Sequence, residues 1–197
     1  MVLYSDSASP LDHAVRIVLA EKDISVDIRY VEGDERPEEL AELNPYGRVL
    51  TLVDRELVLY QAQIIMEYLD ERFPHPPLMP VDPVSRANNR QVRYRIVRDL
   101  FSLCDEIGKG GAAAAARKTL RDHLTALAPA VTQTPWFMSE EYSLVDCCMA
   151  PLLWRLDHYG IKLPTSARVM QKYAERLFMR PAFRASLSQQ ERELRAA

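Results

Sequence analysis

The residue types that most often carry chemistry are sparse in this chain and lack the spacing that known sites require. The three cysteines form neither a disulfide framework nor a zinc-binding pattern. His13, His123 and His158 show no metal-ligand spacing, and we interpret them as structural. The glycine-rich segment at 108–111 lacks the P-loop pattern. We therefore expect no metal, no cofactor and no nucleotide site.

Two serines are more informative because each stands where a helix is expected to begin. Ser9 precedes Pro10, and Asp12 follows near the positive end of the helix, so Ser9 is predicted to be an N-cap. Ser143 and Asp146 form a predicted capping box at the start of the most apolar helix. Both serines are interpreted first as structural.

The elements that position these residues differ between the two parts of the chain. The first 77 residues predict the order β-α-β-α-β-β-α, which is the thioredoxin-like arrangement. Strands are expected at 2–4, 26–30, 49–53 and 57–60, and helices from Pro10, over 38–43 and from Gln61.

Proline marks the change to the second part. Five of the chain's 13 prolines lie between Pro74 and Pro83, and proline restrains the backbone and prevents continued helix. We expect an ordered connector rather than a flexible one. Later helices are expected at 84–107, 113–128, 143–158, 166–178 and 188–195. The predicted class is α/β plus all-α, with a thioredoxin-like domain at 1–77, a proline-rich linker at 78–83 and a helical domain at 84–197.

Composition limits the partners. The formal net charge is −3, from 28 acidic and 25 basic residues, which argues against direct binding to nucleic acid. The longest apolar run, at 147–154, is too short to cross a bilayer, which takes about 20 residues. No secretory signal pattern is visible at the start. We expect a cytoplasmic protein that does not enter the membrane.

Several stretches resemble the stringent starvation protein A family. The most specific is EYLDERFPHPPLMP at 67–80, and NPYG at 44–47, TLVDREL at 51–57 and VRIVLAEK at 15–22 are also similar. The segment SLVDCCMAPLLWRL at 143–156 resembles the capping-box segment of glutathione S-transferases. The resemblance implies a glutathione S-transferase fold and a homodimer without transferase activity. It also implies association with bacterial RNA polymerase holoenzyme carrying the primary sigma factor during stress.

Four positions predict a degenerate glutathione site. Ser9 stands where related proteins have the cysteine of a C-P-x-x-x-x-x-R motif. Leu50 replaces a cis-proline, and a non-proline cis bond costs about 2.5–4 kcal/mol. Gln61-Ala62 replaces a Glu/Gln-Ser pair, so a hydroxyl is lost. The prediction is a non-enzymatic regulator. The alternatives are a glutathione-dependent transferase or thiol-reductase, whose Ser9 hydroxyl would bond a thiolate, and a dimeric scaffold with unrelated partners.

The segment Pro74-His75-Pro76-Pro77 has two interpretations. It is a rigid linker with a chance histidine, or a partner-binding surface that loses little entropy on docking because its shape is fixed. The resemblance implies the second role, together with an aromatic residue a few positions later. That position here is Asp82, which we include in the predicted surface.

The helix after the linker is expected near the two-fold axis of a homodimer. Arg86, Arg90 and Arg93 share one of its faces. They are expected to be solvated or paired with acidic neighbours, or else to meet an acidic partner or Glu67 and Glu71 of the second subunit. The apolar residues expected at the dimer contact are Ile96, Val97, Leu100, Phe101 and Cys104.

Overall fold

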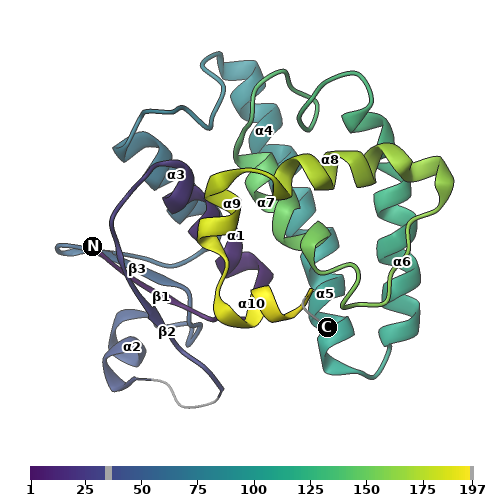
Figure 1. Cartoon of the computed structure of the whole chain (residues 1–197). Coiled ribbons are helices and arrows are strands. Elements are labelled where there is room, and N and C mark those ends of the chain that lie inside the picture. The colour runs from purple at the N-terminus through teal and green to yellow at the C-terminus, as the bar shows by residue number, and fades with distance from the viewer. Residues whose placement is uncertain (34–36, 196–197) are drawn as a thin grey trace.

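The computed structural model describes residues 1–33 and 37–195 and begins with a four-stranded sheet in the order β2-β1-β3-β4 (Figure 1). Its strands are β1 (Val2–Ser5), β2 (Asp27–Tyr30), β3 (Thr51–Asp54) and β4 (Leu57–Leu59). Strand β1 is parallel to β2 and antiparallel to β3, and β3 is antiparallel to β4. This is the predicted thioredoxin-like arrangement.

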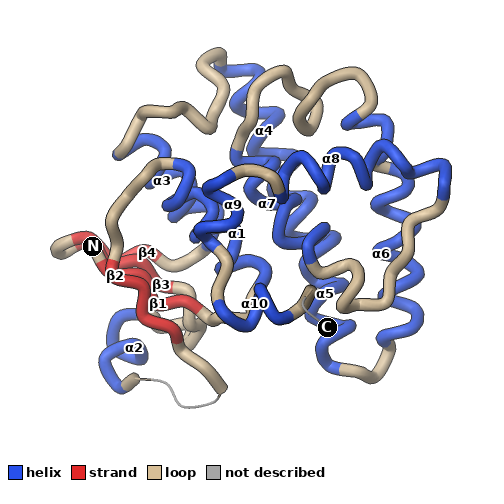
Figure 2. The backbone as a smooth tube through the Cα atoms, viewed as in Figure 1, coloured by secondary structure: helices blue, strands red, loops and turns tan. Residues whose placement is uncertain are grey.

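Side-chain alternation along the strands gives the sheet two buried faces. Leu3 and Leu52 belong to the main core, together with residues of α1 (Pro10–Glu21) and α3 (Ala62–Arg72). Tyr4 points the other way and packs with Leu40 of α2 (Glu38–Leu43). Figure 2 shows α2 on one side of the strands and α1 and α3 on the side nearer the helical part. Helix α1 therefore lies between the sheet and the helical domain.

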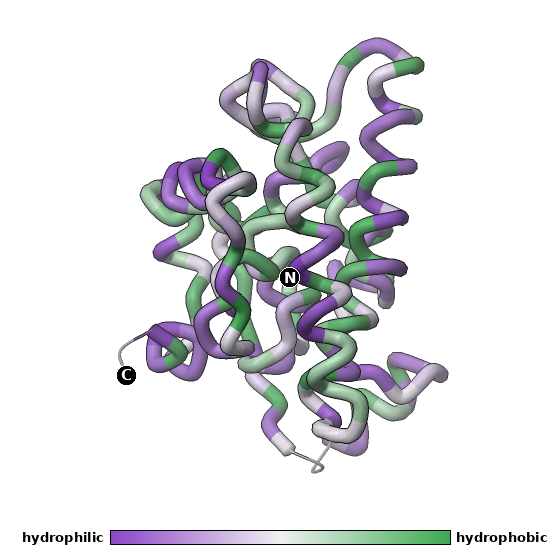
Figure 3. The backbone as a smooth tube through the Cα atoms, turned by 90° about the vertical axis from the view of Figure 1, so that its right-hand side faces the viewer, coloured by the Kyte–Doolittle hydropathy of each residue, from purple (hydrophilic) through white to green (hydrophobic). Residues whose placement is uncertain are grey.

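The second part of the chain is helical, as predicted. It contains α4 (Pro83–Arg95), a π-helix (Ile96–Phe101), α5 (Ser102–Lys109), α6 (Ala113–Ala126), α7 (Leu144–Trp154), α8 (Arg168–Phe178), α9 (Pro181–Ser186) and α10 (Gln189–Glu193), with short 3-10 helices at Ala128–Val131 and Thr165–Ala167. Figure 3 shows hydrophobic and hydrophilic residues alternating along helices at the surface, as amphipathic packing requires. Within the described residues, no helix is long and apolar enough to cross a membrane.

Beyond shifts of one to three residues at several ends, three features of the helical part differ from the sequence predictions. The helix expected at 84–107 changes to a π-helix over Ile96–Phe101 before it continues as α5. The helix expected to reach 158 ends at Trp154, and Arg155 caps it. Helix α9 was not expected; it has only six residues, with Pro181 in its first turn. These differences leave the predicted architecture intact.

Helix α7 forms the centre of the helical part. Every residue from Leu144 to Leu153 is buried, and the capping box predicted at Ser143 and Asp146 is present. Asp146 also accepts hydrogen bonds from the Phe137 amide, at 3.0 Å, and the Tyr173 hydroxyl, at 2.6 Å. The cap therefore also fixes the preceding loop and α8 to the centre.

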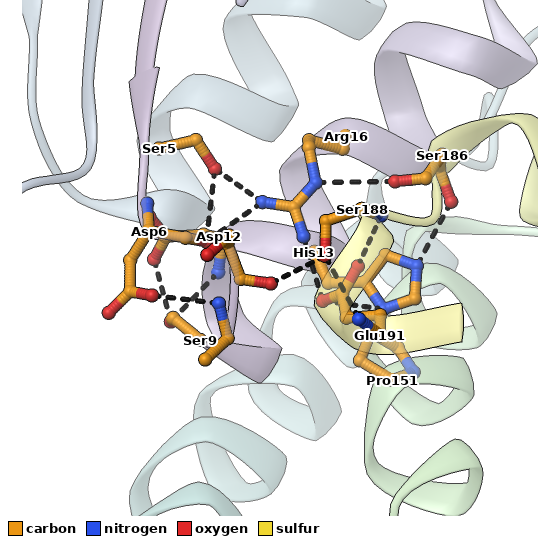
Figure 4. Close-up of polar contacts among 12 residues, drawn as sticks. Ser5, Asp6, Ser9, Asp12, His13, Arg16, Pro151, Ser186, Ser188 and Glu191 are labelled. Carbon is orange, nitrogen blue, oxygen red and sulfur yellow. Dashed lines mark hydrogen bonds and ion pairs between the residues drawn. The ribbon is translucent and has the colours of Figure 1, made fainter. Parts of the chain in front are cut away.

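The two parts are joined by a buried ionic network around Glu191 (Figure 4). Glu191 lies in α10, and its side chain is 0% exposed. Its Oε1 accepts a hydrogen bond from Arg16 Nη2 of α1 at 2.7 Å and another from the Arg155 guanidinium at the end of α7. Its Oε2 accepts from the Ser188 amide at 2.9 Å, which completes a capping box. One carboxylate thus connects α1, α7 and α10.

His13 completes the network as a neutral ring. Its Nε2 lies 3.0 Å from Ser186 Oγ, and its Nδ1 lies 3.3 Å from Glu191 Oε1. Burial and the positive charges of Arg155 and Arg16 hold the pKa of His13 well below its ordinary value. The net charge of the cluster is therefore set by the two arginines and the one carboxylate.

The network predicts a large effect of Glu191→Gln on stability. The substitution keeps the side-chain size but leaves two buried guanidinium groups without a carboxylate, and breaking a buried pair costs about 3–5 kcal/mol. We expect the free energy of unfolding, measured by urea denaturation, to fall by that amount. Glu193→Gln, on an exposed position of the same helix, is the control and should change little. A loss of less than about 1 kcal/mol for Glu191→Gln would show that the pair does not hold the domains together.

Candidate functional site

The four residues of the predicted degenerate glutathione site surround one cavity. Ser9, Leu50, Gln61 and Ala62 line a space of about 260 Å³ at the edge of the sheet, next to the π-helix. They come from the β1–α1 loop, the α2–β3 loop and the start of α3. The structure therefore brings together positions that are up to 53 residues apart in sequence.

Ser9 is the N-cap of α1, as expected, and its hydroxyl is already occupied. The hydroxyl oxygen accepts from the Asp12 amide at 3.3 Å, and its proton is donated to Asp12 Oδ1 at 2.7 Å. Asp12 Oδ2 accepts from the Asp6 amide at 2.7 Å. To bond a thiolate, Ser9 would have to give up its bond to a buried carboxylate.

Burial raises the pKa of Asp12 to about 6, even though the bonds from Ser9 and Asp6 favour the ionised form. The residue is 5% exposed. Because Asp12 also lines the cavity at Ser9, its ionisation changes the charge inside that cavity.

Leu50 and Ala62 offer little polar contact to a ligand. Among the described residues the one cis peptide bond is His75–Pro76, so the Val49–Leu50 bond is trans. Leu50 and Ala62 are both buried apolar residues. Gln61 has a positive φ of 104°, which is rare for a residue other than glycine, and its side chain does not cap α3. The backbone at the start of α3 is unusual, but the hydroxyl that the resemblance calls for is missing.

The remaining lining is mixed in charge. It includes Asp105 and Arg48, and the rings of Tyr46 and Tyr60 lie 5.4 Å apart at centroid distance. The cavity is large enough for a small polar molecule, but none of its side chains is a cysteine.

The cysteines elsewhere are unsuited to nucleophilic chemistry. All three are buried and free, and burial raises the pKa of Cys104 and of Cys148 to about 12. Burial also raises the pKa of Cys147. Since the thiolate is the reactive form, these thiols are inert near neutral pH. A thiol-reductase reaction through any of them is therefore disfavoured.

The second predicted site, the proline-rich segment, is exposed and firmly held. Pro74, His75, Pro76 and Pro77 are all on the surface. Beneath them Lys22, at the end of α1, forms a buried ion pair of 2.6 Å with Asp70 of α3 and also donates to the Pro76 carbonyl.

The chain after these prolines is anchored as well. Asp70 accepts from the Leu78 amide at 2.8 Å, and the Leu78 carbonyl accepts from the Leu144 amide at 2.9 Å. The segment is therefore attached to α1, α3 and α7, and its shape is fixed by both domains.

Asp82, the last residue predicted for this surface, is the N-cap of α4. Its carboxylate accepts from the Ser85 amide at 2.9 Å, and this bond lowers its pKa. An aromatic residue at this position could not form that cap. Asp82 therefore has a local structural reason to be present and adds a negative charge to the surface.

Of the alternatives for the arginines on α4, the structure shows pairing with acidic neighbours of the same chain. Arg90 and Arg93 both bond Glu67, with 2.8 Å between Arg90 Nη2 and Glu67 Oε2, and Arg86 lies 3.3 Å from Glu71. These pairs form within one chain rather than across a dimer interface. They attach α4 to α3.

The apolar residues expected at the dimer contact also lie elsewhere. Ile96, Leu100, Phe101 and Cys104 are buried in the core of their own chain, and Val97 is partly buried. The physical reason is that the π-helix packs against α1 and α7 of its own chain. Among the apolar side chains left exposed, Leu57, Ile64 and Tyr94 lie along one face of β4, α3 and α4.

Sequence reasoning missed the network of Arg16, Arg155 and Glu191. The pair of Arg16 and Glu191 spans 175 positions, so no local pattern predicts it. One signal was available: Ser188 and Glu191 have the capping-box spacing, which fixes the start of a helix. It would not have identified the arginines.

The geometry predicts a pH-dependent contribution of Asp12 to stability. Its pKa is about 6 in the folded protein and near 3.8 in an unfolded chain. Because the pKa of Asp12 is higher in the folded protein, its protonation adds to the free energy of unfolding. This stabilisation is present in full below about pH 4 and is lost as the pH rises through about 6. Relative to Asp12→Asn, the parent should lose about 3 kcal/mol of unfolding free energy between about pH 4 and pH 7. Urea denaturation across this range tests it, with exposed Asp122→Asn as control. A pH-independent difference would contradict the assignment.

Comparison with known proteins supports the fold described above. The family models for the glutathione S-transferase N-terminal and C-terminal domains match residues 3–77 and 110–177. A glutathione S-transferase from Xylella fastidiosa superposes with a TM-score of 0.86 at 21% identity, covering 96% of this chain and 98% of that one, which shows the fold.

Two curated relatives are similar to nearly the whole chain. A maleylacetoacetate isomerase of Pseudomonas aeruginosa is 29% identical, covering 93% of this chain and 94% of that relative. A protein named stringent starvation protein A homolog, from Coxiella burnetii, is 48% identical, covering 99% of this chain and 95% of that relative. The exposed proline-rich segment, the transferase fold and this full-length identity together show that the chain belongs to the stringent starvation protein A family.

Proposed function

We propose that this protein is a non-enzymatic, cytoplasmic transcription regulator. It associates with bacterial RNA polymerase holoenzyme carrying the primary sigma factor during stress or starvation. The observation that carries the proposal is the exposed Pro74–Pro77 segment, which the buried Lys22–Asp70 pair holds in one shape. A surface that is ordered before binding loses little entropy on docking, which suits a transient regulatory contact. The net charge of −3 favours a protein partner over direct contact with nucleic acid.

The residues that line the cavity at Ser9 support a non-enzymatic role. The Ser9 proton is committed to Asp12, Ala62 supplies no hydroxyl and Leu50 follows a trans peptide bond. Similarity to an isomerase keeps a second candidate in view, a glutathione-dependent enzyme that uses Ser9. The two proposals place function at opposite ends of α1 and are separable by experiment.

Substitution within the proline-rich segment Pro74–Pro77 tests the leading proposal. Changing Pro74, His75 and Pro76 together to alanine removes the apolar rings and the imidazole from the exposed segment. We expect retention of purified holoenzyme on the immobilised protein to weaken about tenfold, equivalent to about 1.4 kcal/mol. Circular dichroism and light scattering on the triple variant control for the fold. Retention equal to the parent's by a folded variant would place the contact elsewhere, and no retention by the parent would refute the function.

Glutathione should not bind measurably. A buried polar ligand group without its partner costs about 1–3 kcal/mol, and the cavity lacks several expected partners. Titration calorimetry with millimolar glutathione, alongside an active transferase of the same fold as positive control, should give no saturable heat. Saturable heat together with turnover in a conjugation assay would favour the enzymatic candidate.

We also propose that the protein is a homodimer, with the exposed face of Leu57, Ile64 and Tyr94 at its contact. These side chains are 41%, 54% and 53% exposed and lie on one face of the chain. Burying such a patch gains about 25 cal/mol for each Å² of apolar surface.

Charge placed in that face should separate the subunits. We expect Ile64→Glu to shift the mass by light scattering at micromolar concentration from twice the chain mass to the single-chain value of 22.6 kDa. Met179→Glu changes an equally apolar, 70% exposed residue outside this patch and should remain dimeric. A parent that is itself monomeric would refute the proposal.

A further inference from the structure

The two domains of this chain carry formal charges of opposite sign. Residues 1–77 contain 16 acidic and 7 basic residues, whereas residues 84–197 contain 11 acidic and 18 basic residues. The thioredoxin-like domain therefore has a formal charge of −9 and the helical domain one of +7, which the net charge of −3 conceals. A charge asymmetry of this kind indicates that one part of the chain has a charged partner.

Part of the excess positive charge forms a row along α8 and α9. Arg168, Lys172 and Arg176 follow at intervals of four residues, so these exposed positions share one face of α8, opposite its buried residues. Exposed Arg184 of α9 donates from Nε to the Phe178 carbonyl at 3.2 Å, which places it at the end of α8. Figure 1 shows α8 running across the helical domain toward α9. These four residues, here called the cationic row, extend over about 15 Å of helix.

The positive charge of the cationic row is not neutralised within the chain. Other arginines of the helical domain are paired, Arg155 with Glu191 and Arg180 with Glu21. In the part of the chain that the structure describes, the four residues of the row form no ion pair. The acidic residue on the same face of α8, Glu175, is exposed and likewise forms no ion pair among the described residues. The row therefore presents its charge to the solvent.

The helix that carries most of this row is firmly held from below. Tyr173 of α8 donates a hydrogen bond of 2.6 Å to Asp146 in the capping box of α7. Just after α8, the guanidinium of Arg180 bonds both carboxylate oxygens of Glu21 in α1, at 2.6 and 2.7 Å. Since both ends of these contacts lie in the folded core, α8 keeps its position when a partner docks, and the backbone beneath the row needs no further ordering.

Two kinds of polyanion fit a row of cations, and the charge of the other domain favours one of them. Duplex DNA carries one charge per about 1.7 Å of its axis and repels a domain whose formal charge is −9. The charge of an acidic polypeptide segment is local, and salt screens it beyond about 8 Å. Its carboxylates also accept paired hydrogen bonds from arginine side chains. The observations therefore favour an acidic polypeptide.

We infer that the cationic row on α8 and α9 is a docking surface for an acidic polypeptide segment of the polymerase holoenzyme. The inference rests on the proposed function and adds a contact outside the proline-rich segment. Exposed charges of this kind steer a partner of opposite charge during approach, so they act mainly on the rate of association and on its salt dependence. The row therefore brings the chain to the holoenzyme in one orientation.

Charge reversal within the row has a control matched in chemistry. Lys172→Glu reverses one charge of the row, and Arg168→Glu added to it reverses a second, both at exposed positions. The controls are Lys109→Glu and the same variant with Arg117→Glu, which change the net charge equally at exposed positions outside the row. Lys109 precedes α6, whereas α8 contacts the 3-10 helix that follows the other end of α6. The controls therefore alter the same total charge without altering the row.

The measurement is the association rate constant with immobilised, purified holoenzyme, by surface plasmon resonance at low and at physiological salt. At low salt we expect Lys172→Glu to slow association about threefold and the double variant to slow it about tenfold. The difference from the parent should shrink at physiological salt, because salt screens exposed charges. Both controls should stay within about twofold of the parent.

The outcomes distinguish this inference from the function beneath it. If the parent binds holoenzyme and the row variants associate as fast as their controls, the inference is wrong and the proposed function stands. Binding of the parent to duplex DNA alone, lost in the row variants, would identify nucleic acid as the occupant and overturn the inference. Loss of the dimer in the row variants, by light scattering, would assign the row to a second copy of the chain and overturn it as well. If the parent does not bind holoenzyme, the proposed function falls and this inference falls with it.

Discussion

The buried carboxylate of Glu191 is the interaction on which the arrangement of the two domains depends. Arg16 and Arg155 have side chains only 1% and 2% exposed, and an unpaired charge at such a depth costs several kcal/mol. The carboxylate comes from a five-residue helix near the end of the described chain. Folding of this short segment therefore completes a site that begins in α1, and the domains cannot rotate relative to one another without breaking it.

Helix α1 transmits this constraint to both surfaces of interest. Its first turn holds Ser9 and Asp12 at the cavity, its middle supplies His13 and Arg16 to the network, and Lys22 at its end supports the linker. At 1.5 Å per residue, Ser9 and Lys22 lie about 20 Å apart along the helix. The proline-rich segment is therefore separate from the cavity at Ser9. In this account the fold of an enzyme family is retained as a rigid support for a docking surface.

Much of this arrangement follows from local sequence signals. The caps at Ser9 and Ser143 were predictable because their hydrogen bonds join residues three or fewer positions apart. The strands were predictable from alternation, and the linker from its prolines. Gathering Ser9, Leu50 and Gln61 around one cavity required the family resemblance, because local patterns do not set how loops meet.

The features that escaped prediction are those set by tertiary contact. The pair of Arg16 and Glu191 has no local signature. Pairing of the α4 arginines with acidic neighbours was expected, but the choice of Glu67 in the same chain is set by the packing of α4 beside α3. Leu100 and Phe101 are buried because their helix packs against α1 and α7 of the same chain, which the apolar spacing alone does not reveal. Asp82 illustrates the reverse case: it departs from the family pattern, yet it makes a standard helix cap that its sequence neighbours explain.

The central claim is that this chain acts through the linker surface rather than through the cavity at Ser9. Hydrogen exchange of the backbone amides, measured by mass spectrometry with and without purified holoenzyme, tests it most directly. The account predicts added protection across residues 73–83, with exchange at Ser9–Asp12 and Leu50–Ala62 unchanged. Protection confined to the Ser9 cavity, or no change anywhere at saturating holoenzyme, would contradict it.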